Sequence, residues 1–218
     1  MGAITRSAAN NITTSGVILP AGINDASVAS ITALAQVSAG DGITLISSQT
    51  ASSSASLSFT TGIDSTYRTY MFKFINMHAS AQGQFEFQAS TNGGSSYGVT
   101  LTSTLFQAEH YETDSSTFFD YNGGRDLAQS TSYQFLNGAD LGTNNDDNFC
   151  GTMSLFSPSS TTYVKHFIFQ GNVNDYSARC VNTYIAGYFN TTSALNAISF
   201  RMSTGNIDAG TILMYGIA

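Results

Sequence analysis

The chain has 218 residues, enough for one substantial core or for one domain preceded by an arm. Only 10% of the residues are charged and the net charge is -7, so the chain lacks the clustered lysine and arginine that neutralise nucleic-acid phosphates. No apolar run approaches the roughly 20 residues that span a bilayer, and the N-terminus lacks the apolar region of a secretory signal. We therefore expect partners other than nucleic acid or membrane.

Residues 1–42 differ from the rest in being rich in small residues and free of aromatic ones. Pro20 favours an extended backbone before it, and Asn24 or Asp25 could cap a short helix that reaches Leu34. Because so short a helix is not stable alone in water, we expect it to need a partner surface. The sequence predicts a docking arm and linker over residues 1–42, with contacts from Ile12, Val17, Ile18, Leu19 and Pro20.

From residue 43 onwards, short apolar alternations are separated by clusters of glycine, asparagine, serine and aspartate, a pattern typical of antiparallel strands. We expect strands at residues 44–49, 56–60, 68–77, 84–90, 149–156, 162–170, 179–189, 195–202 and 211–217. About ten strands without a convincing helix between them indicate an all-β fold. We predict an antiparallel, jelly-roll-like β-sandwich over residues 43–218, preceded by the extended arm with at most one short helix.

One hairpin stands out in this pattern. Alternation over residues 84–90 predicts a strand with Phe85 and Phe87 toward the core and Glu86 toward solvent. The next four residues, Thr91-Asn92-Gly93-Gly94, suit a tight turn, after which the apolar face resumes at Tyr97, Val99 and Leu101.

Residues 109–147 hold eight of the fourteen acidic side chains of the chain. This composition predicts long exposed loops, with a short strand near residues 118–121 and one helical turn near residues 127–136. The stretch from Asp140 to Asn148 is dense in the oxygen donors that calcium prefers, but it lacks the glycine and terminal glutamate of an EF-hand. We predict no metal or cofactor site and name only weak calcium candidates, Asp140, Asn144, Asp146 and Asp147.

The chain lacks the motifs of nucleophilic, phosphate-binding and zinc sites. Its three histidines have no metal-ligand spacing, and its loop carboxylates are expected to be solvated. We therefore predict no catalytic residue. The two cysteines, Cys150 and Cys180, are expected to be buried thiols, and the sequence leaves open whether they pair.

The last strand is apolar on both faces, so it must be covered on both sides, by a sandwich or by a neighbouring subunit. The candidate subunit contacts are Leu213, Met214, Tyr215 and Ile217. Tyrosines beside asparagine- and glycine-rich loops also invite stacking on a sugar ring, and the candidates are Tyr111, Tyr121 and Tyr133. Packing or subunit contact is the alternative explanation for these tyrosines.

A family resemblance rests on this last strand and on four earlier stretches, LISSQTASSS from Leu45, FTTGIDSTY from Phe59, STNGGSSY from Ser90 and PSSTTYVKHF from Pro158. Together they resemble small virion proteins of marine tailed phages, including cyanophages, over roughly residues 40–218. The resemblance implies a non-enzymatic virion component, a decoration of the capsid or a part of the tail. We expect a homo-oligomer, preferably a trimer, whose arm contacts other virion proteins. The alternative is a short tail fibre or adhesin that recognises a host surface glycan.

Overall fold

The computed structural model describes residues 12–13, 16–17 and 42–218, and the chain divides into two units, Met1–Gly40 and Asp41–Ala218. In the first unit, β1 (Ile12–Thr13) pairs antiparallel with β2 (Gly16–Val17), and Ile12 lies opposite Val17. Ile18, Leu19, Pro20 and the helix expected near residues 24–34 lie outside the described residues.

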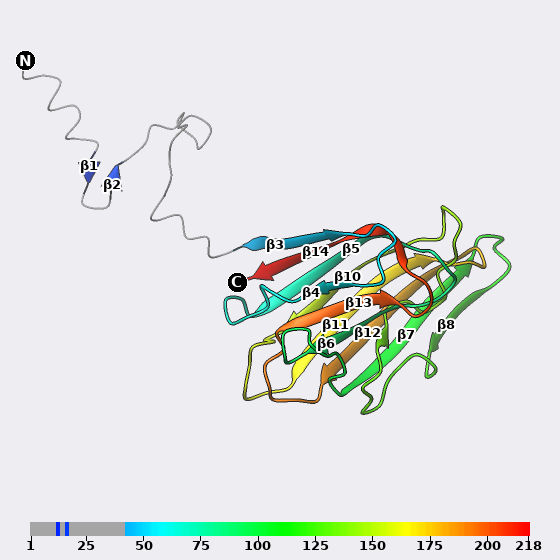
Figure 1. Cartoon of the computed structure of the whole chain (residues 1–218). Coiled ribbons are helices and arrows are strands. Elements are labelled where there is room, and N and C mark those ends of the chain that lie inside the picture. The colour runs from blue at the N-terminus through cyan, green and yellow to red at the C-terminus, as the bar shows by residue number, and fades with distance from the viewer. Residues whose placement is uncertain (1–11, 14–15, 18–41) are drawn as a thin grey trace, which may run out of the picture. The chain divides into compact units, whose positions relative to one another are not determined.

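The second unit is built on an eight-stranded antiparallel sheet in the order β3-β14-β5-β10-β11-β12-β7-β8 (Figure 1). Its strands are β3 (Ile43–Thr50), β5 (Thr69–Ala79), β7 (Leu101–Tyr111), β8 (Thr117–Tyr121), β10 (Phe149–Phe156), β11 (Lys165–Asn174), β12 (Arg179–Phe189) and β14 (Ile207–Ile217). The C-terminal strand β14 is an interior strand, next to the edge strand β3, because β3 and β5 pair with its two edges.

A four-stranded antiparallel sheet in the order β4-β13-β6-β9 packs against one face of the larger sheet. Its strands are β4 (Leu57–Phe59), β6 (Phe85–Ser90), β9 (Gln134–Phe135) and β13 (Ala197–Met202). The two sheets confirm the predicted all-β, antiparallel, jelly-roll-like sandwich. The described residues contain no helix, so none is long and apolar enough to cross a membrane.

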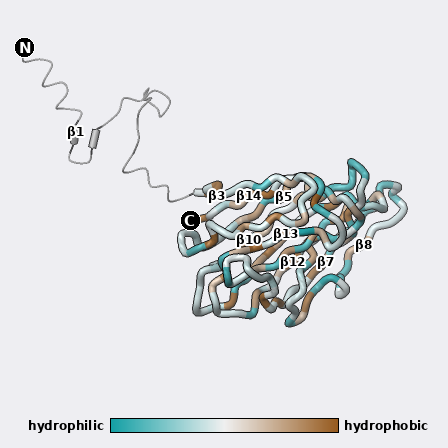
Figure 2. The backbone as a smooth tube through the Cα atoms, viewed as in Figure 1, coloured by the Kyte–Doolittle hydropathy of each residue, from teal (hydrophilic) through white to brown (hydrophobic). Residues whose placement is uncertain are grey.

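Phenylalanines from both sheets fill the space between them. The ring of Phe200 on β13 lies 5.1 Å from that of Phe74 and 5.4 Å from that of Phe72 on β5. Farther along, Phe87 of β6 meets Phe167 of β11 at 5.1 Å. All five side chains are at most 2% exposed, and such edge-to-face and tilted pairs add to the stabilisation from burial. Figure 2 shows hydrophobic positions interspersed with hydrophilic ones along the strands of the sandwich.

The predicted hairpin at residues 91–94 is wrong. Strand β6 pairs with β13 and β9 in the small sheet, whereas β7, which follows the turn, belongs to the large sheet. The glycines of the turn do adopt positive φ, 69° at Gly93 and 85° at Gly94, but the chain then crosses from one sheet to the other. The turn after Met202 does the same, since β13 and β14 lie in different sheets.

The segment between β8 and β10 also differs from expectation. The strand near 118–121 is confirmed as β8, but no helical turn forms at 127–136. Instead this stretch packs beside β6, where Gln88 donates hydrogen bonds to the carbonyls of Thr131 and Ser132. Leu136 and Leu141 are buried, so the acidic region is only partly an exposed loop. This covering layer explains why Glu86, predicted to face solvent, is 5% exposed.

Candidate functional site

The main candidate site is the outer face, which we define as the face of the eight-stranded sheet turned away from the four-stranded sheet. Opposed residues of antiparallel strands point to the same side, so the register identifies its members. The described residues contain ten exposed large hydrophobic side chains, and seven lie on this face: Ile43, Leu45, Ile75, Phe106, Phe119, Tyr121 and Ile168. The face is therefore the main apolar surface of the sandwich.

The outer face is also almost free of charge. The strand residues of the outer face include one lysine, Lys73, and a single carboxylate, Asp208. Asp208 lies at one end of the sheet, where its carboxylate is 3.3 Å from Nδ1 of His78. This contrasts with a chain of fourteen acidic residues and net charge -7. Depletion of charge together with exposed aromatic and aliphatic side chains is typical of the centre of a protein interface.

Two of the hollows in the described part of the chain lie in the middle of the outer face. One of about 430 Å³ lies between β7, β11 and β12 and is lined by Thr104, His166, Ile168, Ala186 and Tyr188, among others. The other, of about 620 Å³, spans β5, β10, β11 and β12 and is lined by Lys73, Ile75, Thr152, Gln170 and Asn172, among others. The exposed side chains of Ile168 and Ile75 lie beside these hollows, so the outer face carries both projections and depressions, as two interlocking surfaces require.

The structure places the four predicted subunit contacts on two sides of β14. Leu213, Tyr215 and Ile217 point to the outer face, where each is partly buried, while Met214 points into the core and has no exposed surface. Met214 is therefore not available to a neighbour. Tyr215 lies opposite Leu45 and Ile217 opposite Ile43, so the available three join the apolar surface at the β3 edge.

The three predicted glycan-contact tyrosines do not come together. Tyr121, on β8, lies on the outer face opposite Phe106, and its hydroxyl donates to Asp126, which raises its pKa. The ring of Tyr133 packs under Arg201, with the guanidinium carbon 3.8 Å from the ring centroid. Arg179 lies 5.4 Å from the Tyr111 ring in the same way. Only Tyr121 of these three belongs to a cluster of exposed aromatic rings.

That cluster was not foreseen from the sequence, because its members come from three strands. Phe106 stacks on Tyr184 of β12, with ring centroids 5.1 Å apart and ring planes at 9°. Phe119 contacts the Phe106 ring edge to face, with centroids 5.8 Å apart. The Tyr184 hydroxyl accepts a hydrogen bond from Gln170 at 2.8 Å. Only the strand order β11-β12-β7-β8 reveals that these residues are neighbours.

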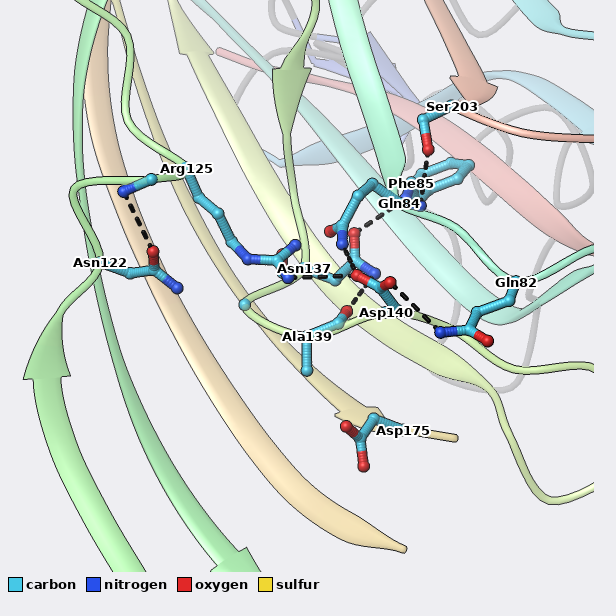
Figure 3. A network of polar contacts seen from close by, with 12 residues as sticks. Gln82, Gln84, Phe85, Asn122, Arg125, Asn137, Ala139, Asp140, Asp175 and Ser203 are labelled. Carbon is cyan, nitrogen blue, oxygen red and sulfur yellow. Dashed lines mark hydrogen bonds and ion pairs between the residues drawn. The ribbon is translucent and has the colours of Figure 1, made fainter. Parts of the chain in front are cut away.

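The carboxylates of two calcium candidates, Asp140 and Asp147, are committed to hydrogen bonds within the protein, whereas Asp146 is exposed and accepts a hydrogen bond from Asn174 only through its backbone oxygen. Figure 3 shows the Asp140 carboxylate facing Arg125, Gln84 and Gln82, and Nη2 of Arg125 lies 3.1 Å from Oδ1. Asp147 is buried and accepts hydrogen bonds from the backbone and side-chain nitrogens of Asn144, at 3.0 and 2.9 Å. No group of three or more histidine, cysteine, aspartate or glutamate residues suited to a metal occurs in the described residues.

The cysteine expectation is wrong in part. Cys150 is half-buried and Cys180 exposed, both are free, and both lie on the outer face. Cys150 donates to Oδ1 of Asn76 at 3.5 Å, and Cys180 accepts a hydrogen bond from Asn172 at 3.1 Å. An outward position on a strand leaves a small side chain accessible, and the sequence alone does not show which face of the sheet is covered.

Comparison of the chain with protein families, with curated proteins and with solved structures gives no match.

Proposed function

We propose that this chain is a non-enzymatic structural protein of a phage virion, which assembles with copies of itself through the outer face and attaches to the capsid or tail through residues 1–42. The observation that carries the proposal is the outer face, a wide sheet surface with seven exposed large hydrophobic side chains and almost no charge. The virion setting comes from the resemblance to marine phage proteins over residues 40–218.

The partner proposed for the outer face is a second copy of the chain, within a homotrimer. Two features support a copy rather than an unrelated protein. The near absence of charge lets copies with a net charge of -7 meet there without repulsion between carboxylates. Isoleucine knobs such as Ile168 and the hollows of about 430 and 620 Å³ occur on the same face, so the surface carries both halves of an interlocking contact.

Light scattering after size-exclusion chromatography tests the assembly. We expect the wild-type chain to form a trimer. Leu45→Lys or Ile168→Lys should yield monomers, because each places a charge in the apolar contact between copies. Both side chains are more than half exposed, so their replacement should cost the fold little. Ser95→Lys, on the exposed turn between the two sheets, is the matched control and should leave the trimer intact. A wild-type monomer at tens of micromolar would contradict the proposal.

Particle incorporation tests the virion role. Deletion of residues 1–40 should abolish incorporation into the particle, while incorporation at wild-type levels would contradict attachment through this segment. Copy number separates the two locations: hundreds per particle indicate the capsid, and small multiples of six or twelve indicate the tail.

An adhesin that binds a host glycan is the second candidate, and one observation favours it. Phe106, Phe119, Tyr121 and Tyr184 form an exposed aromatic surface on which sugar rings could stack. Binding of the purified chain to host cells, lost in Phe119→Ala and retained in Ile168→Lys, would favour this function over a purely structural role.

A further inference from the structure

Strand β8 ends the eight-stranded sheet and is exposed along its whole length. All five residues, Thr117 to Tyr121, are exposed, and β7 is the only strand that pairs with β8 in the described part of the chain. Natural edge strands are usually protected by lysine, proline or a covering loop. The sequence of β8, TFFDY, contains neither lysine nor proline, and Asp120 is its one charged residue, which would repel an acidic strand and attract a basic one.

The hydrogen-bond pattern shows which backbone groups remain free. Asn122 N donates to Leu105 O at 2.9 Å, and Tyr111 N donates to Ser116 O at 3.2 Å, one bond at each end of the β7–β8 pair. Antiparallel strands alternate between bonded and non-bonded residue pairs, so Phe118 and Asp120 bond to β7. The N–H and C=O groups of Thr117, Phe119 and Tyr121 therefore point to the open edge.

Aromatic side chains lie on both faces of this edge. Phe119 and Tyr121, which are 74% and 56% exposed, lie on the outer face, and Phe118, 54% exposed, points to the opposite side. An added strand would cover these rings with its own side chains while its backbone satisfied the free groups. Backbone pairing gives such a contact affinity, and the flanking rings favour apolar side chains.

The charge around β8 selects the kind of strand. Glu112, Asp114 and Asp120 are exposed there, and Asp114 faces His110 at 3.0 Å. The two nearby arginines already have partners, Arg125 with Asp140 and Arg179 with Asp175 and Glu109. The open edge is thus acidic. Two copies paired antiparallel at β8 would bring the acidic loops at its two ends together, which disfavours self-pairing.

We propose that β8 is a docking edge for an extended segment of another protein, in which apolar side chains alternate with lysine or arginine. The segment adds as a ninth strand to the large sheet, its apolar side chains contact the Phe119 and Tyr121 rings, and its cations face Asp114 and Asp120. This goes beyond the contact between copies proposed above: it uses backbone groups at the open edge, and it assigns the Phe119 and Tyr121 rings, at the β8 end of the outer face, to the added segment.

The test uses the full-length chain and a fluorescent nine-residue peptide that alternates lysine with valine and threonine. Fluorescence anisotropy should show binding that weakens as salt is raised, because the cations contribute. The same peptide with glutamate in place of lysine should bind at least tenfold more weakly. Two further peptides carry N-methyl groups on the odd-numbered or on the even-numbered backbone nitrogens. Only one of them should lose binding, because alternate N–H groups of a strand point to opposite edges and the peptide pairs with β8 through one edge.

Two variants of the protein locate the site. Phe119→Pro removes an N–H that points to the open edge and breaks no bond to β7, so it should weaken peptide binding more than tenfold, whereas Phe119→Ala, which keeps that N–H, should weaken it less. Ile168→Lys, which tests the contact between copies, should leave peptide binding unchanged. No binding of the lysine peptide, or equal binding by Phe119→Pro and wild type, overturns the proposal. So does a fall in oligomer size caused by Phe119→Pro and not by Phe119→Ala, since both variants remove the ring from the outer face and only the proline blocks the edge, which would then belong to a second copy.

Discussion

The guanidinium of Arg179 is bound to the carboxylate of Asp175, with Nε 2.9 Å from Oδ2, at the turn that joins β11 to β12. The Asp175 side chain has no exposed surface, and its other oxygen accepts hydrogen bonds from the backbone nitrogens of Ser177 and Arg179. Arg179 also reaches Glu109 on β7 at 2.8 Å. The hydrogen bond to Asp175 raises the pKa of Arg179, so the guanidinium stays charged throughout the accessible pH range. One ion pair therefore fixes a turn and ties it to the neighbouring strand.

Replacement of Asp175 should destabilise the fold strongly. In Asp175→Asn the guanidinium loses the fully buried one of its two carboxylate partners and keeps Glu109, so we expect a loss of up to the roughly 3–5 kcal/mol that a broken buried pair costs. Urea unfolding should show this loss as a lower midpoint with an unchanged slope. Asp114→Asn, an exposed residue paired with His110, is the control and should change the stability by less than about 1 kcal/mol. Equal effects of the two substitutions would contradict the importance of burial at Asp175.

Glu86 should make stability depend on pH in a definite direction. Burial raises its pKa above 4.5, and the hydrogen bond from Arg201, at 2.7 Å, opposes this only in part. The folded state therefore holds the proton more tightly than the unfolded chain does. The resulting contribution to stability is fully present below pH 4.5 and is lost as the pH rises through the folded-state pKa. Relative to Glu86→Gln, the wild-type chain should lose stability above pH 4.5, as measured by urea unfolding from pH 4 to 8. A constant difference would show that the pKa is not raised.

Local pattern predicted most of the strands, because alternation over five to ten residues depends only on which face is buried. It missed β7, which runs from Leu101 to Tyr111, where the sequence predicts a strand near residues 97–101 and loops from residue 109. Strand β11 illustrates this: Phe167 and Phe169 point inward, and Ile168 and Gln170 outward. Local pattern did not predict strand partners. The turn at Gly93 and Gly94 has the expected φ values, yet β6 pairs with β13, more than a hundred residues away, through contacts such as Glu86 opposite Arg201.

The same limit applies to the candidate sites. The apolar pattern of residues 211–217 correctly predicted a strand with apolar side chains on both faces. Only the pairing in the sheet shows that Met214 points inward and Tyr215 outward. The aromatic cluster and the open edge of β8 both depend on strand order, which places Phe106, Phe119 and Tyr184 together. The position of a strand in its sheet leaves little trace in its own sequence.

Gly187 should not tolerate a side chain. A Cβ atom there would lie 2.5 Å from Cζ of Phe167 and 2.6 Å from the backbone oxygen of Thr102. The backbone cannot yield as a flexible side chain would, so Gly187→Ala should cost about 1–3 kcal/mol or more through overpacking. Gly123→Ala is the control, since its nearest neighbour would lie at 3.8 Å, an ordinary contact. Thermal unfolding should separate the two variants by several degrees, and equal melting temperatures would contradict the close packing at Phe167.

Lys165 should be a source of instability that a single substitution removes. It points inward from β11, has no exposed surface, and donates a hydrogen bond to the carbonyl of Thr191 at 3.1 Å, with no carboxylate within salt-bridge distance in the described residues. Burial lowers its pKa below 10.5. The folded state therefore binds this proton less tightly than the unfolded chain does, and the cost is fully present at neutral pH and disappears as the pH rises toward 10.5.

Lys165→Met, which keeps the length of the side chain and removes the charge, should raise the free energy of unfolding at pH 7 by about 1–2 kcal/mol. The gain over the wild-type chain should shrink between pH 7 and 10 in urea unfolding, because the lysine becomes neutral. Lys73→Met, on the exposed outer face, is the matched control and should show no such pH dependence. Destabilisation by Lys165→Met at pH 7 would mean that the hydrogen bond to Thr191 outweighs the cost of burying the ammonium group.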